Sequence, residues 1–240
     1  MAQTSAIEAK DRILSAATQL FSQKGYDATR VNDIASAANV NKALIYYYFK
    51  SKEDILDYIV HSVLNNAVSI TLDFIQTNII QMIKDGSLDI RPDRLHFANA
   101  EAVGHFLQNA SKFLERVVDY LIEKKDIIRV LMLESLKSGK HQNSLFRFTD
   151  FLRDNEKIFK TISDTGQEFV HSHDIVLFEF FFSIIPIFSF AAYFDDYKAV
   201  SSLSDDELRS SFLWVSEVII ASLVSGTDIL LKNNIQKIKQ

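Results

Sequence analysis

Apolar residues recur along most of the chain with the three- and four-residue spacing of a helix. Near the start, Ile13, Ala17 and Leu20 follow this spacing and predict a helix over residues 8–24, which Gly25 then ends. The same pattern predicts further helices at residues 52–84, 92–123, 126–138, 143–163, 174–196 and 204–232. The 2 Pro and 6 Gly leave few breaks, whereas a strand-rich chain of 240 residues needs many turn residues. The pattern therefore predicts an all-α fold.

Two short helices are predicted between the first helix and the long helix that begins near residue 52. Thr29 is expected to cap the first of them, because its hydroxyl can accept a hydrogen bond from an unpaired backbone N–H. Asn39 follows at a tight turn, where asparagine tolerates the left-handed conformation, and Asn41 is expected to cap a helix over residues 42–49. Two short helices joined by a tight turn are typical of a helix-turn-helix, whose second helix enters the DNA major groove.

The second short helix has a core face and an outward face. At 100° per residue, Ile45 marks the core side, with Tyr48 and Phe49 near it. The outward face presents a small residue, a phenol and a cation, with two larger side chains at its flanks: Ala43, Tyr47 and Lys50, then Leu44 and Tyr46. Tyrosine and lysine can reach phosphate oxygens, and leucine can contact a thymine methyl group. The outward face therefore has the residue types of a DNA-reading surface.

Charge is divided unevenly along the chain. The net charge is −5, which by itself argues against nucleic-acid binding, but residues 1–52 carry 7 Lys or Arg against 4 Asp or Glu. The first 52 residues are therefore net +3 and the remainder is net −8. A basic head on an acidic body predicts two functions in one chain.

One stretch of the sequence resembles a known family. It contains Ala28-Thr29-Arg30-Val31-Asn32-Asp33-Ile34-Ala35 and then Ile45-Tyr46-x-Tyr48-Phe49-x-x-Lys52. These motifs resemble those of the TetR family of bacterial transcription regulators, and the resemblance covers residues 8–60. It implies an all-helical homodimer with an N-terminal three-helix DNA-binding domain that contains the helix-turn-helix, here residues 1–51. A larger helical ligand-binding and dimerisation domain, here residues 52–240, is implied to follow.

The resemblance also implies a mechanism and a set of DNA contacts. A small molecule bound in the body changes the distance between the two reading heads, so that a repressor leaves its double-stranded operator. Asn39 and Ala43 stand where the family commonly has glycine, and Leu44 stands where it commonly has a small or polar residue. Carried over residue by residue, the implied DNA contacts are Thr29, Arg30, Asn41, Lys42, Ala43, Leu44, Tyr46, Tyr47 and Lys52. We therefore expect a ligand-responsive, sequence-specific DNA-binding transcriptional repressor.

The body supplies candidate residues for effector binding and for dimerisation. Four phenylalanines could line a pocket for a small apolar or amphipathic effector, although core packing is favoured for any one of them: Phe106, Phe113, Phe148 and Phe151. Excess apolar surface near the C-terminus predicts a homodimer interface that contains Phe178, Phe181, Ile185, Phe188, Trp214, Val218 and Leu223.

Enzyme and metal chemistry are not expected. With 0 Cys, the chain has no thiolate zinc site and no cysteine nucleophile. His171, His173 and Asp174 fit a solvated loop better than a metal site, and Glu101 with His105 fits an ordinary pair on one helix face. No spacing resembles a hydrolase signature or a phosphate-binding glycine loop. No catalytic residue, metal or cofactor is predicted.

Residues 175–194 have the length of a membrane span. This run of twenty residues carries one charge, Glu179, and Pro186 interrupts it. A helix buried on all sides in a core or an interface has the same composition. A membrane-anchored or partner-binding helical protein is therefore the alternative. The main expectation is a cytoplasmic protein with no membrane partner, because residues 1–11 lack the apolar core of a signal peptide.

Overall fold

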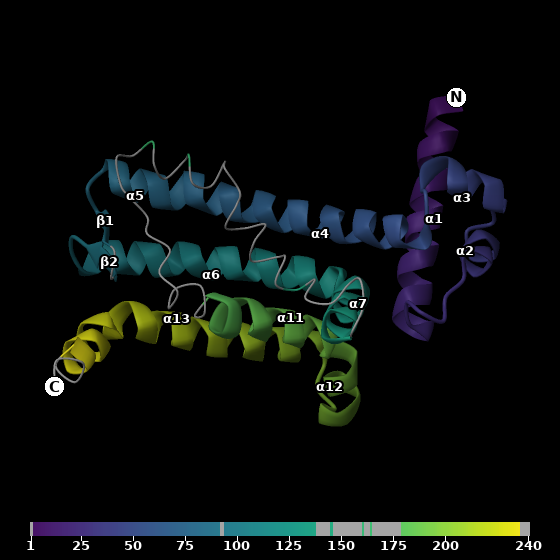
Figure 1. The fold of residues 1–240 in the computed structure, drawn as a ribbon. Helices are drawn as coiled ribbons and strands as arrows, with labels where there is room; N and C mark the ends of the chain where they lie inside the picture. The colour runs from purple at the N-terminus through teal and green to yellow at the C-terminus, as the bar shows by residue number, and fades with distance from the viewer. Residues whose placement is uncertain are drawn as a thin grey trace.

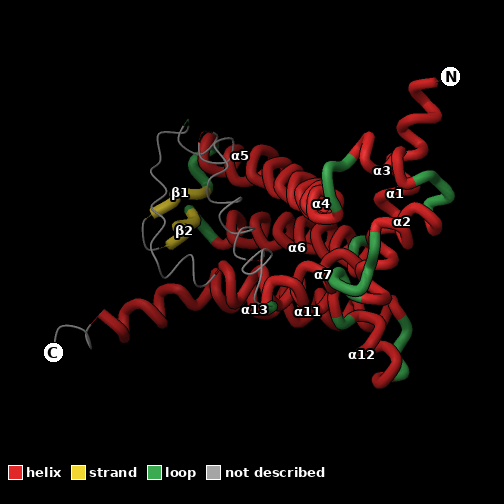
Figure 2. Tube along the Cα trace, turned by 45° about the vertical axis from the view of Figure 1, so that its right-hand side comes forward, coloured by secondary structure: helices red, strands yellow, loops and turns green. Residues whose placement is uncertain are grey.

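The structure is a computed structural model that describes residues 2–91, 94–137 and 179–235, together with positions 145, 160 and 164. Three helices form a head at one end of the molecule, and long helices run away from it side by side to form the body (Figure 1). A short β-hairpin lies at the end of the body that is farthest from the head (Figure 2). The described residues are otherwise helical or in connecting turns, which confirms the all-α fold class.

The head contains α1 (Ala2–Lys24), α2 (Val31–Ala37) and α3 (Lys42–Tyr48). Gly25 ends α1 with a φ of +85°, and its backbone N–H donates to the Phe21 carbonyl at 3.0 Å. Asn39 turns the chain between α2 and α3 with a φ of 52°, a left-handed conformation that asparagine tolerates. Both turns are therefore made by the residues that the sequence indicated for them.

The body is built on α4, α6 and α13, with shorter elements between them. Its described elements are α4 (Lys52–Phe74), the π-helical segment η1 (Ile75–Ile79), α5 (Ile80–Lys84), β1 (Leu88–Arg91), β2 (Arg94–Phe97), α6 (Ala100–Glu123), α7 (Lys125–Leu136), the π-helical segment η2 (Glu179–Ile184), α11 (Ile185–Ala192), α12 (Phe194–Ser201) and α13 (Asp205–Ile235). The helix predicted over residues 52–84 is therefore interrupted by η1, and the one predicted over residues 143–163 lies outside the described residues except for two positions.

The β-hairpin corrects the prediction of a helix that begins at residue 92. Strands β1 and β2 pair antiparallel, with Leu88 opposite Phe97 and Arg91 opposite Arg94. Leu88 is buried and Phe97 packs against the apolar cluster at this end of the body, so one face of the hairpin covers that cluster. Helix α6 begins only at Ala100, where the Asn99 side chain accepts a hydrogen bond from the Ala102 backbone N–H at 2.9 Å.

One apolar cluster runs from the head into the body without a break, and we call it the main cluster. Its buried residues come from α1, α2 and α3, from α4, and from α6, α7, η2 and α11. In α1, Ile13, Ala17 and Phe21 lie at its centre, and Ile127 and Ile128 enter it from α7. A second cluster, the distal cluster, joins η1, α5, β1 and α6 through residues that include Met82, Leu88 and Phe106.

The apolar run at residues 175–194 is not one straight span in its described part. It divides into η2 and α11 and reaches the start of α12, with Pro186 in the first turn of α11. Phe180 and Phe188 are buried in the main cluster, so this segment supplies part of the core of its own chain.

The helical stretch Lys52–Lys84 is long and apolar enough to cross a membrane, judged by length and composition alone. One such stretch is weak evidence for a span, because a core helix of a soluble protein has the same character. Helix α4 in this stretch packs against α1, α6 and α7.

Replacing Phe188 by Ala tests its place in the core. Phe188 is only 2% exposed, so the change removes a buried ring and is expected to lower the free energy of unfolding by about 3–5 kcal/mol. Val200 on α12 is exposed, and Val200→Ala is the matched control, with an expected change below about 0.5 kcal/mol. Urea unfolding of both variants measures the difference, and equal stabilities would contradict the burial of Phe188.

Candidate nucleic-acid interface

Helix α3 buries one face and exposes the other, as its sequence indicated. Ile45 and Phe49 are buried in the main cluster, whereas Tyr47 is 79% exposed and Tyr46 is half exposed. The residues on the solvent side include Lys42 and Ala43, while Leu44 is partly buried at its flank. The exposed face of α3 is therefore a surface of one small, one cationic and two phenolic side chains.

Local contacts hold the exposed face of α3 in place before any DNA is bound. The Asn41 side chain accepts a hydrogen bond from the Leu44 backbone N–H at 2.7 Å and so caps the helix, as predicted. The Tyr47 ring lies edge-on against the Tyr48 ring, with 5.0 Å between their centroids. The Lys42 ammonium lies 5.8 Å from the centroid of the Tyr46 ring. The aromatic groups are thus ordered by neighbours within the same helix.

Thr29 has a different role from the one predicted for it. Its side chain is only 1% exposed, and its hydroxyl donates to the backbone carbonyls of Gly25 at 2.9 Å and Leu20 at 3.2 Å. The N-cap position of α2 belongs to Arg30 instead, whose backbone N–H donates to the Asp33 carboxylate at 3.0 Å. Capping by Thr29 is therefore wrong, and its side chain lies inside the head rather than on its surface. Arg30 is exposed.

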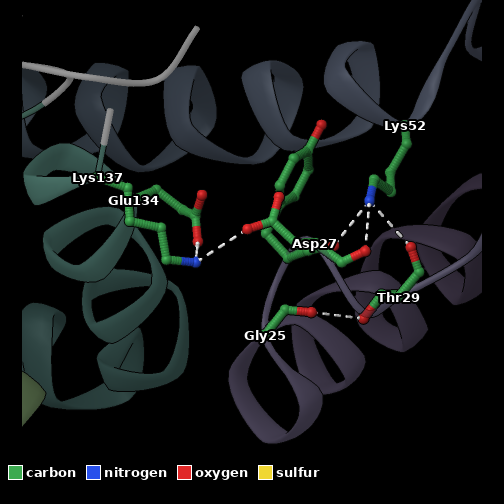
Figure 3. A network of polar contacts seen from close by, with 7 residues as sticks. Gly25, Asp27, Thr29, Lys52, Glu134 and Lys137 are labelled. Atoms are coloured by element: carbon green, nitrogen blue, oxygen red, sulfur yellow. Dashed lines mark hydrogen bonds and ion pairs between the residues drawn. The ribbon is translucent and has the colours of Figure 1, made fainter. Parts of the chain in front are cut away.

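Lys52, which is expected to contact a phosphate, makes its described contacts within the chain. Its ammonium donates to the backbone carbonyls of Tyr26 at 2.7 Å and Thr29 at 3.0 Å, with the Asp27 carbonyl at 3.5 Å (Figure 3). A lysine ammonium has three N–H donors, and the Tyr26 and Thr29 carbonyls occupy two of them at short distance, with the Asp27 carbonyl near the third. The side chain points into the turn between α1 and α2, which we call the α1–α2 turn and define as residues 25–29.

The Tyr26 ring lies beneath the Lys52 ammonium, which is 4.1 Å from the ring centroid. Tyr26 is buried and packs against Phe21, with 5.2 Å between the ring centroids. Burial, reinforced by the negative charge of Glu53, raises the pKa of the Tyr26 hydroxyl well above its ordinary value. Tyr26 therefore remains a neutral phenol and anchors the α1–α2 turn in the main cluster.

A second cation reaches the α1–α2 turn from the body. The Lys137 ammonium, just past the end of α7, contacts the Glu134 carboxylate at 2.6 Å and the Asp27 carboxylate at 3.2 Å (Figure 3). Glu134 is 7% exposed, and its hydrogen bond with Lys137 raises the pKa of that lysine. Sequence reasoning missed this contact because 110 positions separate Lys137 from Asp27 and neither position belongs to a motif.

The residues expected around an effector are only partly described. Phe106 is buried, and the centroid of its ring lies 6.5 Å from that of the Phe74 ring. The Phe113 ring stacks on the Phe74 ring, with 4.6 Å between their centroids. Phe106 and Phe113 are thus brought together through Phe74, a residue of α4 that the prediction did not include. Phe148 and Phe151 lie outside the described residues.

The residues expected at a dimer interface fall into two groups. Trp214 is 66% exposed, and Phe181 and Val218 are also exposed. Phe188 is buried within its own chain, so its expected place in the interface is not supported, whereas Ile185 is only partly buried against the main cluster. Phe178 and the Leu223 side chain lie outside the described residues.

In the part of the chain that the structure describes, no group of three or more His, Asp or Glu side chains is arranged so that it could hold a metal ion. The His105 ring instead lies within hydrogen-bond distance of the Asn109 amide, one turn further along α6. His171, His173 and Asp174 lie outside the described residues.

Known proteins share both the head and a longer part of this chain. The sequence model of the bacterial regulatory proteins of the tetR family matches residues 13–59. The "Probable HTH-type transcriptional regulator YttP" of Bacillus subtilis (strain 168) is 30% identical over 142 residues, which cover 56% of this chain and 68% of YttP. The chain belongs to the TetR family. It is therefore a DNA-binding transcriptional regulator, and the membrane-anchored alternative is not favoured.

Other relatives agree with this assignment. The negative transcriptional regulator IcaR of the biofilm operon icaADBC in Staphylococcus aureus is 50% identical over 48 residues, 20% of this chain and 26% of IcaR. A TetR family transcription regulator from Marinobacter aquaeolei VT8 has the same fold, with a TM-score of 0.54 and 16% identity over 90% of this chain and 98% of that one. A transcriptional regulator from Aquifex aeolicus VF5 gives a TM-score of 0.52, with 18% identity over 88% of this chain and 99% of that one. Regulators of this family bind operator DNA and act as dimers.

Proposed function

We propose that this TetR-family regulator is a repressor whose dimer holds its operator through the two α3 helices and leaves it when a small apolar or amphipathic effector binds the body. Repression is supported by the similarity to IcaR, whose name describes a negative regulator. DNA reading by α3 is supported by its exposed face, where Tyr47 is 79% exposed beside Lys42 and Ala43. That face is the single observation that carries the proposal.

The exposed residues of the head divide into two roles. Lys42 and Arg30 supply positive charge and are assigned to phosphates, with Asn41 beside them at the start of α3. Ala43, Leu44, Tyr46 and Tyr47 line the outward side of α3 and are assigned to base edges, where the small Ala43 permits close approach. Residues 1–51 are the DNA-binding domain of this proposal and residues 52–240 the ligand-binding and dimerisation domain, although the main cluster crosses that boundary.

A salt titration with two variants tests these roles. The binding of each variant is measured on a duplex selected by the wild-type protein from random DNA, and on an unrelated duplex of the same length. Lys42→Met should weaken both and lower the slope of log affinity against log salt by about 1 per phosphate contact, hence about 2 per dimer. Leu44→Ala should keep the slope and reduce the preference at one base pair per half-site by about 1–3 kcal/mol.

The opposite pattern would refute the placement of α3. If Lys42→Met changed sequence preference while Leu44→Ala changed only the salt slope, α3 would not lie in the major groove as proposed. If the wild-type protein selected no duplex at all, operator binding through this face would itself be wrong.

Exposed apolar residues on α13 and η2 supply the proposed dimer interface. Trp214, Val215, Val218 and Ile219 are exposed on α13, and Phe181 and Phe182 are exposed on η2. Their spacing places large side chains on successive turns of one long helix, where a second copy can cover them. An obligate dimer interface buries about 2,000 Å² or more. We therefore assign both α13 and η2 to the interface.

Substitution of Trp214 tests the interface. Trp214→Ala is expected to raise the dimer dissociation constant by tenfold or more, which corresponds to about 1.4 kcal/mol, because buried tryptophans are frequent hot spots. Sedimentation equilibrium across a dilution series measures the change, with Val200→Ala on the exposed side of α12 as the control. A wild-type chain that remains a monomer at micromolar concentration contradicts the interface.

The effector is assigned to the helices around Phe74, Phe106 and Phe113, where aromatic rings from α4 and α6 meet. An effector releases DNA only if it binds the non-reading state of the dimer more tightly than the reading state. A panel of fatty acids, aromatic compounds and cationic amphiphiles should therefore contain members that raise the melting temperature and also release the selected duplex. If no member does either, control by a protein partner or by abundance replaces this part of the proposal.

The proposal includes a location and an absence of catalysis. The relatives are transcriptional regulators, so we assign this chain to the cytoplasm, where its operator would be, and assign no enzymatic role to it. No metal or cofactor takes part in the proposed cycle of binding and release.

A further inference from the structure

Lys52 stands at a position where a cation is unfavourable unless something compensates it. It is the first residue of α4, a helix of 23 residues, and the N-terminus of a helix carries partial positive charge. The two residues that follow, Glu53 and Asp54, have the negative charge that this end prefers. The Lys52 side chain leaves the helix end and places its ammonium among three backbone carbonyls of the α1–α2 turn. Those carbonyls provide the compensation.

The α1–α2 turn connects the end of α1 to the start of the helix-turn-helix. Several of its carbonyls already accept bonds from within the turn: the Thr29 backbone N–H donates to Tyr26 at 3.2 Å, and the Thr29 hydroxyl donates to Gly25 at 2.9 Å. Lys52 adds a charged donor to the same set, and charge-assisted hydrogen bonds are about twice as strong as neutral ones. The turn is therefore fastened to the first residue of α4.

The consequence concerns the orientation of the reading helices. Arg30 follows the turn directly and caps α2, and α2 packs against α3. A change in the α1–α2 turn therefore moves the start of α2 and, through it, the exposed face of α3. The ammonium of Lys52 is half-buried, with two donors in short bonds to the Tyr26 and Thr29 carbonyls and the Asp27 carbonyl at 3.5 Å, so it does not need DNA to satisfy it.

We propose that Lys52 is a positioning residue for DNA recognition, which sets the orientation of α2 and α3 through the carbonyls of the α1–α2 turn and makes no phosphate contact of its own. This inference rests on the proposed reading of operator DNA by α3. It adds a separate claim, namely that sequence discrimination depends on a lysine that lies behind the reading surface.

Two substitutions separate positioning from phosphate contact. Lys52→Met keeps the length of the side chain and removes its charge and donors. Lys52→Arg keeps the charge, but a planar guanidinium cannot direct three N–H groups from one point to three carbonyls. Lys42→Met serves as the proposed phosphate-contact reference, and Lys112→Met, an exposed position on α6, serves as the neutral control.

The readouts are the affinities for a duplex selected by the wild-type protein and for an unrelated duplex, each measured as a function of salt below the melting temperature of every variant. For both Lys52 variants, the ratio of the affinity for the selected duplex to that for the unrelated duplex is expected to fall about tenfold. A loss of this size corresponds to one disturbed base contact. The slope of log affinity against log salt is expected to stay at the wild-type value. Lys42→Met is expected to lower both affinities alike and to reduce the slope by about 2 per dimer.

Each of the following results would overturn the proposal. A lower slope with an unchanged affinity ratio in Lys52→Met would make Lys52 a phosphate contact. A wild-type affinity ratio in Lys52→Arg would show that only the charge of residue 52 matters. This result decides against the positioning role even if Lys52→Met fails to fold. A lower melting temperature with wild-type affinities would leave Lys52 a purely structural role. If wild-type protein selects no duplex, operator reading fails first, and the positioning role fails with it; a selected duplex whose binding ignores Lys52 refutes the positioning role alone.

Discussion

Helix α1 packs one face against the reading helices and against the body, and the orientation of the head depends on that packing. Ile13, Ala17 and Phe21 meet α2 and α3 in the same apolar cluster that contains Ile127 and Ile128 of α7. Burial of large apolar side chains contributes about 1.5–3 kcal/mol each, so this contact outweighs the polar contacts at its edge. The head has no core of its own that is separate from the body.

The polar contacts at the edge of this packing orient the head relative to the body but contribute little to the free energy of folding. The Ser22 hydroxyl donates to the Asp126 carboxylate at 3.0 Å, and Lys137 reaches Asp27 beyond the end of α7. Exposed pairs of this kind contribute about 0–1 kcal/mol, and the Asp27 side chain is largely exposed. Glu134 differs because it is buried, and a buried carboxylate needs its cation. The contact with Glu134 is therefore the stronger one for Lys137, and it places the Lys137 ammonium within reach of Asp27 in the head.

The features that sequence reasoning predicted are those whose causes are local. The turns at Gly25 and Asn39, the cap at Asn41 and the buried face of α3 follow from backbone preferences and helical spacing within a few residues. The contacts of Thr29 and Lys52 were not predicted because their partners are backbone carbonyls, which every residue possesses and no pattern marks.

Other misses arose from partners far along the chain. Leu88 and Ile90 on one strand, and Leu95 and Phe97 on the other, recur at every second position as strand residues do. The helical spacing that follows them hid this short pattern, and the apolar partners beneath the hairpin come from other parts of the chain. Phe188 carries the apolar character of an interface residue, and composition alone cannot tell a surface that another chain covers from one that the same chain covers.

The separation of the distal cluster from the main cluster, and from a third cluster in which Leu114 and Val118 of α6 meet Leu213 of α13, has a consequence for the cooperativity of the fold. The distal cluster is built from η1, α5, the hairpin and part of α6, and it does not contain residues of the head. Groups of elements that share a cluster open together, whereas groups in different clusters open with different free energies. We therefore expect amide protons at the hairpin end to exchange with solvent through an opening that leaves α1, α2 and α3 folded, so that a fluctuation at this end of the body need not interrupt DNA recognition.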